Sequence, residues 1–114
     1  MSTGADLIAL ADRLRWAPYF LGYAIDTDVE DPKAAYERDG ANHLFVEWNT
    51  AIWRKQCERI GFHADNDWTV SETIGMASVS PNIKAAMALH CDLIAEKLGD
   101  KLDRYIAAHP APRA

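Results

Sequence analysis

Two groups of polar residues have types and spacings that could do chemistry. His43 and Glu47 are four residues apart, which places them on one face of a helix, and His63, Asp65 and Asp67 crowd one turn. A zinc site needs three or more converging ligands, and acid–base catalysis needs a base beside a reacting group. Here the chain supplies only a pair and a polar turn of the kind that aspartates stabilise. We therefore predict no catalytic residues, no metal and no cofactor, and we expect a protein that is not an enzyme.

A further set of carboxylates has a spacing close to that of a calcium-binding loop. Asp26, Asp28 and Glu30 alternate along the chain, and Glu37 stands where an EF-hand loop has its last ligand. The glycine that the sharp turn of such a loop requires is replaced by Asp31. We interpret the segment as a solvated acidic connector, suited to contact a basic surface of a partner.

Aromatic side chains concentrate in the N-terminal half. Trp16, Tyr19, Phe20 and Tyr23 follow one another at steps that place them on one helical face, and Trp53 falls off the main apolar face of its own helix. Tyrosine and tryptophan are frequent at protein-binding hot spots and equally frequent in cores. Both interpretations stay open from the sequence, and an exposed Trp53 would indicate a partner surface.

The segment 68–87 resembles a helix-turn-helix, in which a short capped helix and a turn ending in Val-Ser precede a recognition helix. In that alternative, Thr69, Ser80, Asn82 and Lys84 would contact DNA, and the protein would act as a dimer through its C-terminal helix. The segment departs from the pattern where a serine holds the turn position usually occupied by glycine. The other interpretation is a plain helical hairpin.

The last third of the chain predicts one long amphipathic helix. Ser80 and Pro81 open it as N-cap and first helical residue, and His109 and Pro110 close it. Its apolar residues recur at three- or four-residue steps and share one face: Ile83, Met87, Cys91, Ile94, Leu98, Leu102 and Ile106. This face must be buried, either against the chain's other helices or against a second copy.

Capping residues and apolar spacing predict the remaining elements. Thr3 and Asp6 form a capping box, and Pro18 starts a second helix after interrupting the first. Helices are predicted over residues 3–14, 18–25, 32–39, 42–60 and 69–79. The expected fold class is an all-α, compact single-domain bundle of five or six helices, with the helices from Asn42 and Ser80 as its central antiparallel pair. The predicted core contains Leu10, Leu14, Phe20, Leu44, Trp48, Ile52, Ile74, Met87, Ile94 and Leu98.

Composition sets the class of protein. With 114 residues, 49% of them hydrophobic, the chain can bury one core, which we expect to span residues 1–108 ahead of a disordered tail over 109–114. The net charge of −5 disfavours nucleic acid as a partner. The N-terminus has no leader-like segment and no apolar run long enough for a membrane span. We therefore expect a cytoplasmic protein with no membrane partner.

Two functions remain as hypotheses. The first is a small acidic module that binds another protein, with Trp16, Tyr19, Tyr23, Trp53 and the acidic connector as its contact residues. By size and charge alone, it is similar to inhibitors and accessory factors of phages and mobile elements, including anti-restriction and anti-CRISPR proteins. The alternative is the dimeric helix-turn-helix regulator of transcription.

Overall fold

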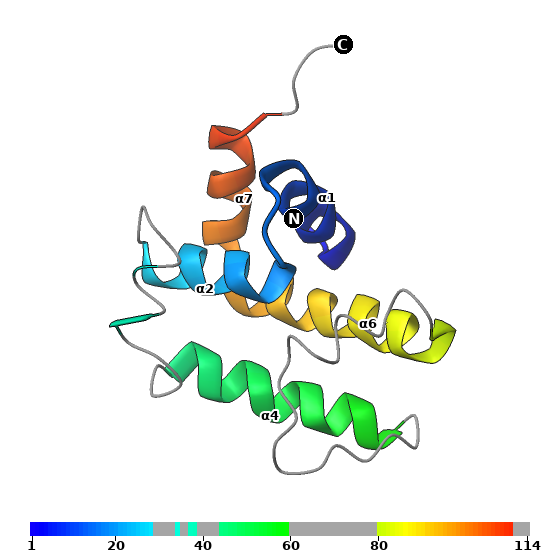
Figure 1. Cartoon of the computed structure of the whole chain (residues 1–114). Helices are drawn as coiled ribbons and strands as arrows, with labels where there is room; N and C mark the ends of the chain where they lie inside the picture. Colours follow the sequence, from blue (N-terminus) through cyan, green and yellow to red (C-terminus); the bar gives the residue numbers. More distant parts are fainter. Residues whose placement is uncertain (29–33, 35–36, 39–43, 60–79, 111–114) are drawn as a thin grey trace.

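The computed structural model describes residues 1–28, 34, 37–38, 44–59 and 80–110. Within these residues the chain is an all-α bundle without strands, as its sequence predicts (Figure 1). The helices are α1 (Gly4–Leu14), α2 (Pro18–Thr27), α4 (Leu44–Arg59), α6 (Pro81–Leu98) and α7 (Asp100–Ala108). The predicted helix over 69–79 lies outside the described residues. Of the one over 32–39, only Ala34, Glu37 and Arg38 are described, and they are helical.

Local signals set the starts and ends of these helices. The Thr3 side chain accepts from the backbone N–H of Asp6 while the Asp6 carboxylate accepts from the backbone N–H of Thr3, so the predicted capping box is present. Pro18 is the first residue of α2. Ser80 caps α6 by accepting from the N–H of Ile83, as predicted. These ends depend on neighbouring residues alone, which is why the sequence reveals them.

α6 is the centre of the bundle and contacts α1, α2, α4 and α7. It runs antiparallel to α4, as predicted for the helix that starts at Ser80 (Figure 1). The most extensive contact of α6, however, is with α1 rather than with α4. α2 lies among α1, α4, α6 and α7, so every residue from Leu21 to Ile25 is buried.

The prediction of one continuous C-terminal helix is wrong, because the chain breaks at Gly99. This residue has φ 56° and ψ −128°, a backbone conformation that side chains with a Cβ avoid. α6 therefore ends at Leu98, and α7 leaves in a new direction (Figure 1). The apolar face continues across the break, since Leu98 and Leu102 are both buried.

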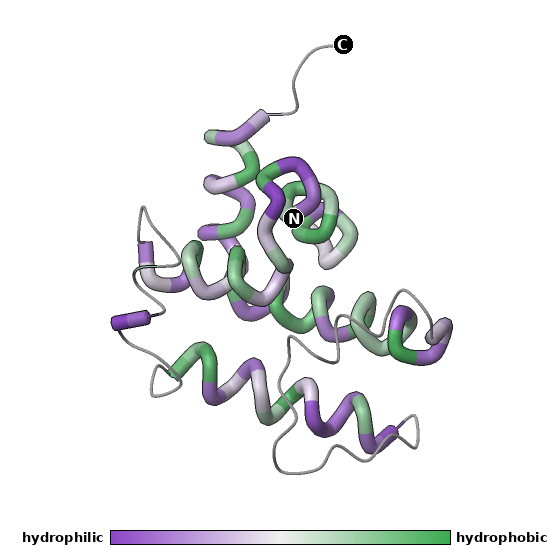
Figure 2. The backbone as a smooth tube through the Cα atoms, viewed as in Figure 1, coloured by the Kyte–Doolittle hydropathy of each residue, from purple (hydrophilic) through white to green (hydrophobic). Residues whose placement is uncertain are grey.

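The buried face of α4 also differs from the prediction. Leu44 was expected in the core but is 79% exposed, whereas Phe45 is buried. The predicted core residues Leu44, Trp48 and Ile52 share one side of the helix, and the observed buried face is turned from that side toward Phe45 and Trp53. Its buried members are Phe45, Asn49, Trp53, Gln56 and Cys57. Asn49 and Gln56 on this face are polar, and the second half of α4 is largely hydrophilic (Figure 2). The apolar spacing in the sequence therefore does not indicate which face of α4 is buried.

The core has two parts. The larger part joins α1, α2, α6 and α7 with Phe45 of α4, and it includes the predicted residues Leu10, Ile94 and Leu98. The smaller part joins Trp53 and Cys57 to Ile83 and Ala86, under the second half of α4. The other predicted core residues, Leu14, Phe20, Trp48, Ile52 and Met87, are half-buried, and Ile74 lies outside the described residues. In the part of the chain that is described, no helix is long and apolar enough to cross a membrane.

Candidate functional site

A cleft of about 340 Å³ lies between the C-terminal end of α2 and α7. Its α2 side is formed by Ala24, Ile25 and Asp28, and its α7 side by Lys101, Arg104, Tyr105 and Ala108. Small and apolar side chains leave the space between the two helices, and charged side chains stand at its rim. This combination, an apolar floor with a few polar groups, is typical of binding sites.

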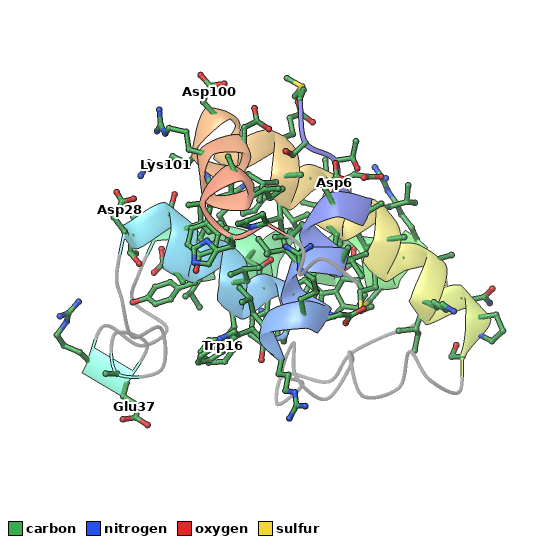
Figure 3. The ribbon with its side chains drawn as sticks, turned by 90° about the horizontal axis from the view of Figure 1, so that it is seen from above. Asp6, Trp16, Asp28, Glu37, Asp100 and Lys101 are labelled. Carbon is green, nitrogen blue, oxygen red and sulfur yellow. The ribbon has the colours of Figure 1, made fainter. Side chains whose placement is uncertain are left out.

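An ion pair joins the two sides of the cleft. The Nζ of Lys101 donates to the carboxylate of Asp28 at 3.2 Å and to the backbone carbonyl of Asp26 at 3.0 Å. Figure 3 shows Lys101 and Asp28 on the same side of the molecule. The ammonium group thus satisfies a free carbonyl near the end of α2, where the helix dipole favours a cation. The pair is exposed, so its contribution to stability is at most about 1 kcal/mol.

A pair of stacked rings lies at the end of α7, on the α7 side of the cleft. Tyr105 and His109 stack with ring centroids 4.2 Å apart and planes 20° apart, and the Nδ1 of His109 lies 2.9 Å from the carbonyl of Tyr105. Arg13 of α1 donates to the backbone carbonyl of His109 at 2.6 Å. Arg104 is exposed and forms no ion pair with any described residue. Its guanidinium is therefore available to a ligand in the cleft.

The structure brings only some of the predicted protein-binding residues to the surface. Asp26 and Asp28 lie at the cleft, while Glu30 and Asp31 fall outside the described residues. Tyr23 and Trp53 are core residues, with 1% and 3% of their surfaces exposed. The exposed Trp53 that would have indicated a partner surface is thus not observed.

The remaining aromatic residues form a half-buried cluster at the start of α2. The ring of Phe20 lies 5.9 Å from that of Trp16 and 5.2 Å from that of Tyr19, measured between centroids. Trp16 and Tyr19 pack against the main core. Such rings offer apolar area with a polar edge to the solvent.

The structure does not bring the four residues predicted to contact DNA together as one surface among the described residues. Thr69 lies outside the described residues, as does the first helix of the suggested motif. Ser80 is half-buried and occupied as the N-cap of α6. Asn82 and Lys84 are exposed on the first turn of that helix.

A buried polar contact that the sequence pattern does not indicate joins α4 to α6. The Nε2 of His90 lies 2.5 Å from the Oδ1 of Asn49, and the Trp53 ring meets the His90 ring edge-on at 5.1 Å. Neither His90 Nδ1 nor Trp53 Nε1 has a hydrogen-bond partner among the described residues. Burial lowers the pKa of His90 to about 4. The pair is inaccessible to a partner, so its role is to position α4.

The described residues contain no group of three potential metal ligands. Cys57 and Cys91 are buried free thiols, and burial raises the pKa of Cys91 to about 12, with a smaller effect from Asp92. A thiol with so high a pKa is not a nucleophile at neutral pH. No family model, curated protein or solved structure matches the chain. The function therefore has to be argued from the geometry of these residues.

Proposed function

We propose that this protein is a small module, without enzymatic activity, that binds another protein at the end of α2. The observation that supports this is the α2–α7 cleft, whose rim continues directly into the acidic segment that starts at Asp26. A partner segment seated in the cleft would meet an apolar floor surrounded by a charged rim, and an apolar centre with a polar rim is typical of protein interfaces.

The charge distribution supports a basic partner surface. The described residues hold eleven aspartates and glutamates and ten lysines and arginines, so most of the net charge of −5 belongs to the other segments. Of the acidic segment over residues 26–31, Asp28 lines the cleft and the carbonyl of Asp26 accepts from Lys101 at the cleft. Attraction between this segment and a basic surface would raise the association rate more than it would raise the affinity. An inhibitor or accessory factor would act in this way by covering a basic site of its target.

The first experiment identifies the partner and tests the cleft. The tagged protein is used to capture partners from nuclease-treated lysate of its native host, with bound proteins identified by mass spectrometry. Ala108→Trp fills the cleft and should reduce capture, whereas Ala107→Trp, an exposed neighbour that does not line it, should not. Equal capture by both variants would overturn the role of the cleft. Loss of all bound material on nuclease treatment would support the helix-turn-helix alternative instead.

A second experiment tests the acidic segment with the captured partner. Asp26, Asp28 and Asp31 are changed to Asn and Glu30 to Gln, because amides keep the side-chain shape and Asn tolerates the left-handed backbone at position 28. The association rate should fall and lose much of its salt dependence. The matched control neutralises four exposed carboxylates elsewhere, those of Asp12, Glu47, Glu58 and Glu96. An unchanged association rate in the first variant would sink this role for the segment.

A further inference from the structure

We infer that the α2–α7 cleft binds the C-terminal carboxylate of a partner polypeptide through Arg104. The inference rests on the proposed function and names the chemistry of the group that the cleft receives. Two cations line the cleft, and they are not equivalent. Lys101 is neutralised by Asp28 and by a carbonyl of α2, whereas Arg104 has no charged partner among the described residues. Among the described residues that line the cleft, Arg104 is therefore the cation without an acidic partner.

The surroundings of Arg104 favour the end of a chain over an acidic side chain. Guanidinium groups bind carboxylates through two parallel hydrogen bonds. The cleft that Arg104 lines also has an apolar floor. This floor is formed by Ala24, Ile25 and Ala108. A C-terminal residue presents a carboxylate and its own apolar side chain on one carbon atom, so it can occupy both parts together. An aspartate or glutamate side chain supplies the carboxylate but leaves the floor empty.

The openness of the cleft favours a polypeptide over a free small acid. Asp28, Arg104 and Ala108 are all exposed, so a molecule in the cleft stays in contact with solvent. Sites for small ligands typically bury about 70–90% of the ligand surface. A polypeptide compensates for shallow burial of its last residue with further contacts along the chain. The acidic rim at Asp28 is placed to accept hydrogen bonds from backbone N–H groups that precede the terminus.

The test uses the full chain and a short fluorescein-labelled peptide that ends in leucine. Fluorescence anisotropy compares the free carboxylate with the C-terminal amide of the same peptide. The carboxylate form should bind about tenfold more tightly, the size expected for a charged hydrogen-bonded pair. Arg104→Gln should remove this difference, and Arg104→Lys should restore only part of it, because an ammonium group cannot form the paired bonds. Arg54→Gln is the control, since it makes the same charge change at an exposed site on α4.

Each outcome decides the inference. Equal affinity of the acid and amide peptides, no binding of either, or an equal effect of Arg54→Gln would overturn it. Binding of N-acetyl-leucine as tight as that of the peptide would also overturn it, in favour of a small-molecule site. A peptide ending in an amide but carrying an internal glutamate should bind like the plain amide. If these experiments fail while Ala108→Trp still blocks partner capture, the carboxylate is excluded and the proposed function stands.

Discussion

The backbone N–H of Gly4 donates a hydrogen bond of 3.0 Å to the carboxylate of Asp92, across 88 positions of the chain. The contact brings the start of α1 against α6 at a distance that only glycine permits. A Cβ built on Gly4 would lie 2.4 Å from both the backbone nitrogen and the Oδ1 of Asp92, and 2.7 Å from the carbonyl carbon of Cys91. Backbone atoms of a central helix cannot move aside as a side chain can.

Gly4→Ala is therefore expected to destabilise the protein by about 1–3 kcal/mol, the usual cost of inserting a methyl group into a packed contact. Alanine would otherwise favour the helix by up to about 1 kcal/mol, so the sign of the change is informative. Urea unfolding measures the free energy. Ala5→Gly at the exposed neighbouring position should cost only the difference in helix propensity. A more stable Gly4→Ala variant would show that α1 does not dock on α6 in this way.

Stability should fall as the pH is lowered through the titration range of His90. The pKa of this residue drops from 6.5 to about 4 on folding, because its ring is buried. Between these values the unfolded chain binds more protons than the folded one, so acid favours unfolding. The stabilisation is complete above pH 6.5 and is lost as the pH falls toward 4, and the free energy of unfolding should be about 2 kcal/mol lower at pH 5 than at pH 7.

The measurement is urea unfolding at both pH values for the native chain and for His90→Gln. The amide cannot titrate, so this variant should lose most of the pH dependence while carboxylates and other histidines are unchanged. The same slope in both proteins would contradict the burial of a neutral His90.

Gly99→Ala tests whether the break between α6 and α7 is required. The added methyl group would meet only the carbonyl oxygen of Glu96, at 3.9 Å, so the cost comes from the backbone conformation alone. A loss of about 1–3 kcal/mol is expected. If α6 and α7 instead formed one continuous helix, alanine would stabilise it by roughly 0.5–1 kcal/mol. Thermal or urea unfolding distinguishes the two by sign.

A pair of neighbouring substitutions tests the buried face of α4. Leu44→Ala should change stability by less than about 0.5 kcal/mol because the side chain is 79% exposed. Phe45→Ala removes a ring that is 1% exposed and should cost about 3–5 kcal/mol. A larger loss for Leu44→Ala than for Phe45→Ala would contradict the observed face of α4.

The features that the sequence reveals are those decided by nearby residues. Thr3 with Asp6, Pro18 and Ser80 mark helix ends through contacts within one turn, and all three are where they were expected. The face of α4 was misjudged because Asn49 is paired across the interface with His90, a tertiary contact with no local signature. Burying an amide is acceptable only when such a partner exists.

The residues of the cleft also could be predicted only in part from the sequence. Asp26 and Asp28 were expected at a binding surface and they line or adjoin the cleft, but Lys101 and Arg104 were not singled out. In one continuous helix over 81–108, these two residues would lie farther along the axis of α6, whereas the observed α7 leaves that axis. They meet α2 only because the chain turns at Gly99, and a single glycine in an otherwise regular pattern does not specify the angle of the turn.

The contact of α1 with helices from the last third of the sequence has a consequence for folding during synthesis. Ser2 and Gly4 are held by Asp103 and Asp92, and hydrogen bonds from the Ser2 side chain and backbone N–H lower the pKa of Asp103. α1 ends at Leu14 and its main partner α6 begins only at Pro81, so the ribosome makes α1 well before α6. At about 5–20 residues per second on the ribosome, the apolar side of α1 waits on the order of ten seconds for that partner. α1 can therefore dock in the bundle only after α6 has left the exit tunnel.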